Sequence, residues 1–215
     1  MNQVMRVATA VDVHAFESSS EHGAAQSGGA QLGGVQSDST TQSSIAAQTS
    51  GAAQLDDTAQ LGAGQSGAAH PDSAARPLML ACLEWPGHRA LAGHSDGDVA
   101  AHAVCDAILI AAGVGEMGTI FGVDRPEFAG ASGESFIREA LRLAREVGFA
   151  VTNISVQIVA QTPRFAPYKD AAQARMSAIV GAPVSVAATS TDHLGFIGAG
   201  EGIAAIATAL LHGIS

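Results

Sequence analysis

Two short stretches of the sequence carry side chains that bind metals. Asp12 and His14 lie two residues apart in the run VDVHAF, and His102 lies in the run HSDGDVAAHAVCD, residues 94–106. If the first run is a strand, both side chains point to one face, about 7 Å apart along the chain, which suits two ligands of one metal. With His102 added, one carboxylate and two imidazoles leave a tetrahedral Zn²⁺ one open position for water or substrate. These residues therefore predict a zinc site that can do chemistry.

The second run also has the periodicity of a helix. Its histidines and carboxylates recur every four residues, at His94, Asp98, His102 and Asp106. On a helix a step of four residues drifts by about 40°, so these side chains form one slowly turning stripe. Ser95 or Asp96 can cap the start of this helix, and Asp98 can complete a capping box with Ser95. Capping does not explain His102 or Asp106, and the alternative for His102 is a buried, hydrogen-bonded structural histidine.

The composition indicates a globular protein that does not bind nucleic acid. The chain has 215 residues, of which 47% are hydrophobic, and a formal net charge of −10. That is enough apolar sequence for a core, and the charge argues against binding a phosphate backbone. Cys82 and Cys105 lack metal-binding spacing and lie in apolar runs, as expected of reduced thiols. We find no run long enough to span a membrane and no signal peptide, and we expect a cytoplasmic protein.

Residues 17–76 differ sharply from the rest of the chain. They are dominated by Ser, Gly, Ala and Gln and have little to bury, so ordering them would not recover its entropy cost. We therefore expect a low-complexity, flexible insertion within one catalytic domain made of 1–16 and 77–215. A tether that docks a partner is the alternative, although no docking motif supports it.

Hydrophobic periodicity predicts alternating strands and helices around these sites. Strands are expected at 4–16, 77–85, 151–161 and 182–191, and helices at 96–113, 133–147 and 167–180. Gly113 and Gly148 are typical helix-ending residues for the first two helices. The run GIAAIATALLHGI, residues 202–214, is compatible with a helix or a strand. This order predicts an α+β fold with a mixed sheet and helices on one face.

Five runs along the chain resemble one enzyme family. DVHAF, GHSDGDVAAHAVCDAIL, GEMGTIFG, AQTPRFAP and TSTDHLGFIGAGEGIA are similar to motifs of the 2-C-methyl-D-erythritol 2,4-cyclodiphosphate synthases. The resemblance covers residues 5–16 and 77–212 and leaves out the insertion. It implies a ferredoxin-like fold and a homotrimer whose active sites lie between adjacent subunits. It also favours a strand over a helix at 202–214.

The resemblance further implies a reaction. The family's substrate is 4-diphosphocytidyl-2-C-methyl-D-erythritol 2-phosphate, and its products are the cyclic diphosphate and CMP, in the non-mevalonate isoprenoid pathway. The attacked phosphorus is surrounded by negative oxygens, so the protein must mainly neutralise charge and position the groups in line. Consistently, the sequence has no P-loop, no GxSxG elbow and no reactive cysteine constellation.

On this resemblance two metals take part. Asp12, His14 and His102 would hold Zn²⁺, and a Mg²⁺ or Mn²⁺ would bridge the α- and β-phosphates. Asp192 stands at the position of the second metal's carboxylate, one methylene shorter than the usual Glu. His94 and Asp192 are the catalytic candidates, and Asp106 is placed to orient the His102 ring. The alternative is that the Asp106 side chain is merely solvated.

The resemblance also assigns substrate contacts. His94 and Ser95 match contacts to the methylerythritol phosphate, and Glu116 and Gly118 match a ribose-contacting Asp-x-Gly. The remaining contacts are those to the cytosine and the diphosphate, together with one further substrate-binding residue, and they fall on Ala160, Pro163, Arg164, Phe165, Ala166, Thr189, Thr191 and Phe196. Without the resemblance, these would be ordinary turn and strand residues.

Two departures and two rival functions remain open. Ala199 stands where the family commonly has Arg, so anion binding on the trimer axis is doubtful, and Val123 replaces an acidic residue that Asp124 could supply. A metal-dependent phosphohydrolase would need the same metal ligands but would release phosphate. A trimeric binding protein without catalysis would need no metal.

Overall fold

The computed structural model describes residues 4–17, 76–93, 95–122 and 130–214. These residues belong to one compact unit formed by Met1–Ser18 and Pro71–Ser215. His94, Val123, Asp124 and all but the two end residues of the predicted insertion lie outside the described residues.

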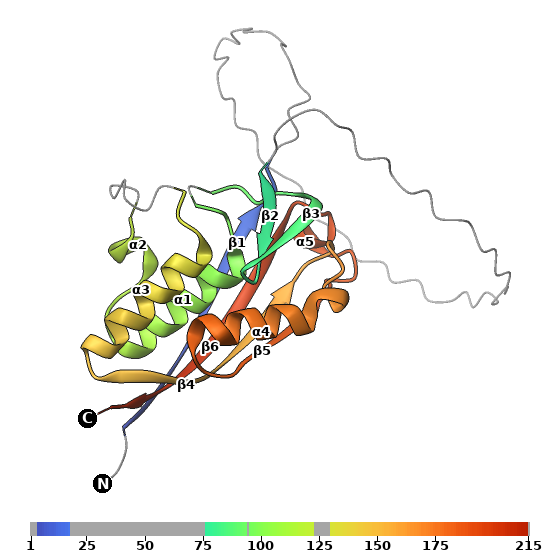
Figure 1. The fold of residues 1–215 in the computed structure, drawn as a ribbon. Helices are drawn as coiled ribbons and strands as arrows, with labels where there is room; N and C mark the ends of the chain where they lie inside the picture. Colours follow the sequence, from blue (N-terminus) through green and yellow to red (C-terminus); the bar gives the residue numbers. More distant parts are fainter. Residues whose placement is uncertain (1–3, 18–75, 94, 123–129, 215) are drawn as a thin grey trace, which may run out of the picture. The chain divides into compact units, whose positions relative to one another are not determined.

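A four-stranded mixed sheet forms the base of the fold (Figure 1). Its strands, in spatial order, are β1 (Met5–Ala15), β6 (Gly202–Gly213), β4 (Phe149–Val159) and β5 (Val184–Thr189). β6 pairs antiparallel with β1 and β4, and β4 pairs parallel with β5. The segment at 202–214, which is compatible with a helix or a strand in the sequence, is therefore the strand β6. Its side chains alternate between the two faces at the centre of the sheet, between β1 and β4.

Three helices lie against one face of this sheet (Figure 1). They are α1 (Val99–Ala112), α3 (Gly133–Glu146) and α4 (Lys169–Val180). α1 contacts β1 and β6, α3 packs on α1, and α4 covers β5. All residues of α1 are buried except Asp106 and Ile110, since its many alanines let neighbouring elements approach closely. The α+β class with a mixed sheet and helices is confirmed.

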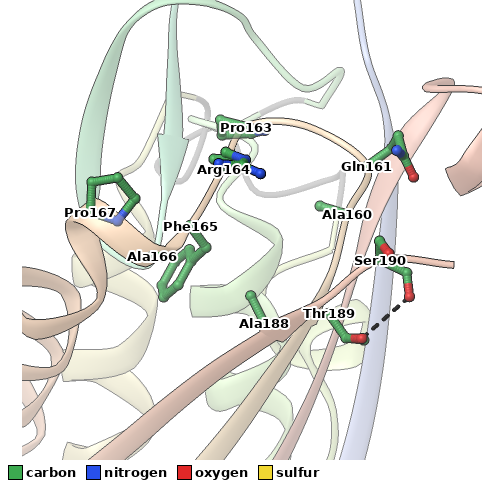
Figure 2. Close-up of a pocket in the computed structure, with 10 residues that line it drawn as sticks. All are labelled: Ala160, Gln161, Pro163, Arg164, Phe165, Ala166, Pro167, Ala188, Thr189 and Ser190. Carbon is green, nitrogen blue, oxygen red and sulfur yellow. Dashed lines mark hydrogen bonds between the residues drawn. The ribbon is translucent and has the colours of Figure 1, made fainter. Parts of the chain in front are cut away.

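Shorter elements complete the described chain. They are α2 (Met117–Ile120), the 3₁₀ turn η2 (Ala166–Tyr168) and α5 (Gly195–Gly198). Residues 160–167 follow β4, and all of them except Thr162 line a pocket beside the end of β5 (Figure 2). Among the described helices, none has the length and apolar character needed to cross a membrane.

The predicted strand at 77–85 is wrong as a single element. It is a hairpin of β2 (Pro77–Leu80) and β3 (Leu83–Arg89). Its turn residues Ala81 and Cys82 have φ angles of 56° and 58°, a conformation that usually requires Gly or Asn. Their N–H groups donate to the carboxylate of Asp98, at 2.9 and 2.5 Å, and this partner supports the unusual turn.

Asp98 also sets the start of α1. Its carboxylate accepts the N–H groups of Ala100 and Ala101, so Asp98 is the N-cap and the helix begins at Val99 instead of residue 96. The expected cap at Ser95 or Asp96 is therefore wrong. Asp98 is fully buried, and burial raises its pKa against the opposing hydrogen bonds from the Cys82 and Ala101 N–H groups.

Candidate functional site

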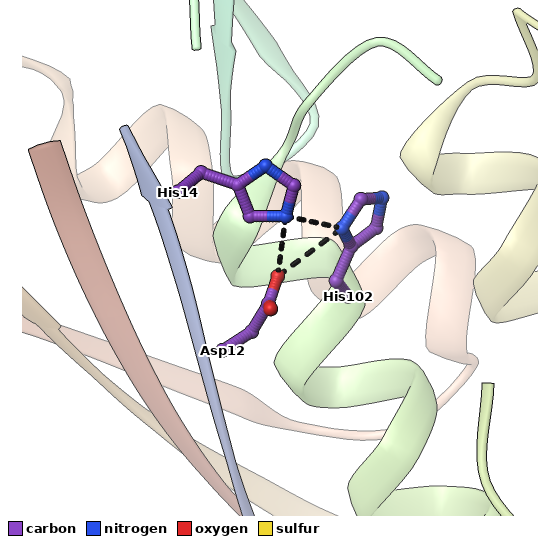
Figure 3. Close-up of side chains that lie close together, drawn as sticks. All are labelled: Asp12, His14 and His102. Atoms are coloured by element: carbon purple, nitrogen blue, oxygen red, sulfur yellow. Dashed lines mark hydrogen bonds and ion pairs between the residues drawn. The ribbon is translucent and has the colours of Figure 1, made fainter. Parts of the chain in front are cut away.

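Three predicted ligands meet between β1 and α1 (Figure 3). Asp12 and His14 project from the same face of β1, and His102 reaches them from the first half of α1. Asp12 Oδ2 lies 3.0 Å from His14 Nε2 and 3.1 Å from His102 Nδ1, and the two ring nitrogens lie 3.2 Å apart. One oxygen and two nitrogens thus converge on one point.

The spacing of these three atoms fits a tetrahedral cation. A Zn²⁺ ion binds nitrogen and oxygen ligands at about 2.0 to 2.1 Å, so two ligands of a tetrahedron lie about 3.3 Å apart. The three separations in the structure are 3.0, 3.1 and 3.2 Å. The cluster therefore needs only a small expansion to hold zinc, and the described residues supply three ligands to it.

The outer nitrogens of both rings have partners. His14 Nδ1 donates to the carbonyl oxygen of Ala92 at 2.5 Å, which leaves the lone pair of Nε2 toward Asp12. His102 Nε2 lies 3.0 Å from Ser95 Oγ, and donation to this hydroxyl leaves the lone pair of Nδ1 toward the cluster. Both histidines are thus held in the orientation that metal binding requires.

Asp106 does not play the part expected of it. Its carboxylate accepts the N–H group of Met117 at 2.6 Å, so it ties the start of α2 to α1. The partner of the outer nitrogen of His102 is Ser95. Burial raises the pKa of Asp106, and the Met117 N–H group opposes that rise.

The ionisation of the cluster favours a bound cation. Burial raises the pKa of Asp12, but hydrogen bonds with His102 and His14 outweigh burial and hold that pKa well below its usual range. The hydrogen bond to Asp12 raises the pKa of His14 although burial opposes it. The carboxylate stays charged, and it attracts a proton or a metal ion to the space between the rings.

A pocket lies at the ends of β4 and β5, with a volume of about 460 Å³ (Figure 2). It brings together the predicted cytosine-binding residues and one predicted diphosphate contact: Ala160, Pro163, Arg164, Phe165, Ala166 and Thr189. Gln161, within the segment 160–166 that the resemblance assigns to the cytosine, also lines it, and three further lining residues were missed: Pro167, Ala188 and Ser190. The parallel pairing of β4 with β5 brings Ala188 and Ser190 here, and only the strand order could have indicated them.

An aromatic stack supports the pocket from behind. The ring of Trp85, which is fully buried, lies 4.1 Å from that of Tyr168 and 5.6 Å from that of Phe165, centroid to centroid. Trp85 comes from β3, so the hairpin packs against the segment that lines the pocket. Within the described residues, Gln161 Oε1 is buried without a hydrogen-bond partner, so this wall holds an acceptor that is free for a donor.

The pocket and the metal cluster lie at the same end of the sheet. Ala204 of β6 pairs with Val13 on one side and with Val159 on the other. Strands are about 4.8 Å apart, so the ends of β1 and β4 are separated by about 10 Å. A ligand of nucleotide size can span such a separation.

Several other predicted site residues belong neither to the three-residue cluster nor to the pocket lining. Asp192 is exposed in the turn after β5, where its carboxylate accepts the Ser190 hydroxyl, and the three-residue cluster does not include it. Glu116 and Gly118 are exposed at α2, and Phe196 is exposed on α5. Thr191 donates its hydroxyl to the Leu194 carbonyl. The three-residue cluster and the pocket therefore both belong to one chain and lie at the same end of its sheet, whereas the remaining predicted contacts are part of neither.

Comparison with known proteins identifies relatives of the chain. The YgbB family profile matches residues 61–212. A bifunctional enzyme IspD/IspF of Clavibacter michiganensis subsp. michiganensis is 53% identical over 142 residues, 66% of this chain and 35% of that protein. The 2-C-methyl-D-erythritol 2,4-cyclodiphosphate synthase of Acidothermus cellulolyticus is 47% identical over 142 residues, 66% of this chain and 88% of that protein. The chain spans about a third of the first relative and most of the second.

Solved structures show the same fold. The bifunctional IspDF of Campylobacter jejuni superposes with a TM-score of 0.70 and 25% identity, over 100% of this chain and 44% of that one. An IspF–CDP complex of Plasmodium falciparum superposes with a TM-score of 0.63 and 19% identity, over 98% of this chain and 97% of that one. Together, the profile match and the identity to the Acidothermus synthase show that this chain belongs to the YgbB family, the 2-C-methyl-D-erythritol 2,4-cyclodiphosphate synthases.

Proposed function

We infer that this chain cyclises 4-diphosphocytidyl-2-C-methyl-D-erythritol 2-phosphate to 2-C-methyl-D-erythritol 2,4-cyclodiphosphate with release of CMP, a step of isoprenoid biosynthesis. Family membership supports the reaction. The observation that carries it in the structure is a converging Asp12, His14 and His102 cluster at the same sheet end as a nucleotide-sized pocket. An oxygen of the 2-phosphate attacks the outer phosphorus of the diphosphate, and the bond from that phosphorus to the CMP oxygen breaks.

This chemistry needs no covalent protein nucleophile. Burial raises the pKa of the Cys82 and Cys105 thiols well above the usual range, so neither is a thiolate at neutral pH. The chain's task is to hold the two phosphate groups in line and to offset their charge. Arg164, exposed at the pocket, supplies one positive charge for that purpose.

Asp12, His14 and His102 are the residues that would hold Zn²⁺. A bound zinc ion would act as a Lewis acid that draws charge from a phosphate oxygen. The carboxylate of Asp12 offers charge to the site, while the neutral rings of His14 and His102 offer directed lone pairs. Their near-tetrahedral spacing supports zinc over a cation that prefers six oxygen ligands.

We assign a second divalent cation, Mg²⁺ or Mn²⁺, to Asp192. Such ions are typically held by one or two carboxylates and by the phosphates of the substrate. Asp192 is exposed and is tied to Ser190, which lines the pocket, so its carboxylate lies at the edge of the nucleotide site. Asp192 and His94 are the catalytic candidates that complete the account.

The pocket is assigned to the cytidine of the substrate. Ala160, Pro163, Phe165 and Ala166 provide an apolar wall for a base, while Gln161 offers a buried acceptor. For the rest of the substrate we propose the remaining contacts from the resemblance: His94 and Ser95 for the methylerythritol phosphate, Glu116 and Gly118 for the ribose, and Thr189 and Thr191 near the diphosphate. Phe196 is proposed as one further substrate-binding residue.

We further propose a homotrimer with active sites between its subunits, on a ferredoxin-like arrangement of the sheet. The sheet face opposite the helices carries exposed apolar side chains, among them Val7 at 67% and Val11 at 61% exposure. Exposed apolar surface of this kind usually marks an interface. Ala199 stands where the family commonly has Arg, so this position offers no positive charge to an anion on the proposed trimer axis.

The domain boundaries and the location are also proposals. The carboxylate of Glu17 and the guanidinium of Arg76 are 2.6 Å apart, so the two ends of the 17–76 insertion meet within one catalytic domain. A long insertion adds little closure cost when its ends already meet. The two free, buried cysteines favour a reducing cytoplasm.

The test is to incubate the purified protein with the substrate, Zn²⁺ and Mg²⁺, and to follow products by ³¹P NMR and mass spectrometry. Synthase activity gives CMP and the cyclic diphosphate in equal amounts. Inorganic phosphate without a cyclic product would identify a phosphohydrolase. No turnover by a zinc-loaded protein would favour a binding protein.

A further inference from the structure

We propose that Arg76 is a positioning residue for both histidines of the metal cluster. It touches neither ring; it holds the short segment that carries the partners of their outer nitrogens. This inference rests on the proposed zinc site at Asp12, His14 and His102.

The guanidinium of Arg76 links three parts of the chain. Its Nη1 donates to the carbonyl oxygen of Ser95. Its Nη2 donates to the carbonyl oxygen of Leu91 at 2.8 Å and to Glu17 Oε1 at 2.6 Å. Leu91 and Ser95 are the first and last residues of the short loop before α1. The single side chain of Arg76 therefore holds both ends of that loop.

The same loop supplies the outer partners of the two rings. The carbonyl oxygen of Ala92 accepts His14 Nδ1–H at 2.5 Å. The hydroxyl of Ser95 lies 3.0 Å from His102 Nε2. The positions of these two oxygens decide where the inward lone pairs point, and both follow the backbone that Arg76 holds.

An arginine suits this task better than a lysine. Its planar fork presents several N–H groups in fixed directions, and two of its nitrogens here reach three acceptors. Glu17 balances its charge, with both side chains only a little over one third exposed, at 37% and 39%. A lysine keeps the charge but offers one nitrogen, so it cannot reproduce the same spread of contacts.

The consequence is an effect on metal affinity. Replacing a partner in the shell around metal ligands typically lowers metal affinity by 10- to 100-fold. Loss of the Arg76 contacts frees the carbonyl ends of the loop and lets both rings turn away from Asp12. We expect Arg76→Ala to lower zinc affinity at least about 10-fold.

The experiment measures zinc binding to the full chain by competition with a chromophoric chelator, without substrate. It compares the wild type with R76A, R76K and R6A. Arg6 is the matched control, because its Nη1 donates to the Ala112 carbonyl oxygen at the other end of α1 and its guanidinium stacks on Phe149. Circular dichroism and thermal unfolding report the fold of each variant.

The expected order of zinc affinity is wild type and R6A together, then R76K, then R76A. An R76A affinity within twofold of a zinc-binding wild type would overturn the role of Arg76 and leave the metal site standing. If the wild type itself binds no zinc, the metal site and this inference fail together. Should R76A not fold, R76K decides: an affinity equal to that of the wild type would contradict the inference.

Discussion

The hydroxyl oxygen of Ser95 lies 3.0 Å from Nε2 of His102, and this contact fixes which ring nitrogen faces Asp12. His14 has an equivalent contact through the Ala92 carbonyl oxygen. When a cation occupies the centre of the cluster, these outward contacts let both neutral rings present lone pairs to it; without a cation, the inward ring nitrogens hydrogen-bond Asp12.

Replacing Ser95 with Ala should weaken zinc binding without unfolding the chain. The ring of His102 would lose its outer partner, so we expect an affinity loss of about 10-fold. Chelator competition measures it. Ser177→Ala is the control, since the Ser177 hydroxyl accepts the Val184 N–H group far from the cluster and should not affect zinc. An unchanged S95A affinity would remove Ser95 from the metal site.

Replacing His102 with Ala should abolish zinc binding and activity while the protein stays folded. His102 supplies one of only three ligands from the described chain, and it lies near the helix surface that faces β1. Zinc content by atomic absorption and circular dichroism give the two readings. His88→Ala, an exposed change on β3, should retain zinc. Unfolding of H102A would instead favour a structural histidine.

Replacing Asp98 with Ala should cost stability, about 3 to 5 kcal/mol. The change removes the N-cap of α1 and leaves the buried N–H groups of Ala81 and Cys82 without an acceptor. Urea unfolding measures the difference. Ser132→Ala removes the N-cap of α3 alone and should cost about 1 kcal/mol. Equal losses for the two variants would contradict the joint role of Asp98.

Binding of CDP should change the fluorescence of Trp85. It is the single tryptophan of the chain, and it stacks near Phe165, which lines the pocket. A titration should give a saturable change, and Arg164→Ala should weaken the apparent affinity about 10-fold by removing a charged contact. CDP binding detected by calorimetry with no change in Trp85 emission would place the nucleotide elsewhere.

The two parts of the cluster were accessible from sequence because the residue types and spacing within each part are local, although Asp12 and His102 lie 90 residues apart in the chain. Asp12 and His14 share a strand face through the two-residue period, and His102 could be placed on a helix by its neighbours. The resemblance assigns Ser95 to the substrate and Asp106 to the His102 ring. In the structure the Ser95 hydroxyl lies at His102 Nε2, and Asp106 accepts the Met117 N–H group. Which oxygen meets His102 depends on the loop before α1, and no sequence period describes a loop.

The hairpin shows why the remaining errors arose. Ala81 and Cys82 are poor turn residues, so the sequence predicted one continuous strand through them. Their turn depends on the carboxylate of Asp98, many residues away. The same carboxylate displaces the expected cap from Ser95 or Asp96. The missed pocket residues Ala188 and Ser190 likewise depend on the pairing of two strands.

The most direct test of the account removes the metal and restores it. The protein is stripped of zinc by a chelator, kept in Mg²⁺, and given 4-diphosphocytidyl-2-C-methyl-D-erythritol 2-phosphate, with CMP and the cyclic diphosphate followed by ³¹P NMR. The account predicts no product without zinc and full recovery when one Zn²⁺ per chain is added, for the wild type and not for His14→Ala. Equal rates of cyclic product with and without zinc would contradict the claim that Asp12, His14 and His102 form the metal centre of the reaction.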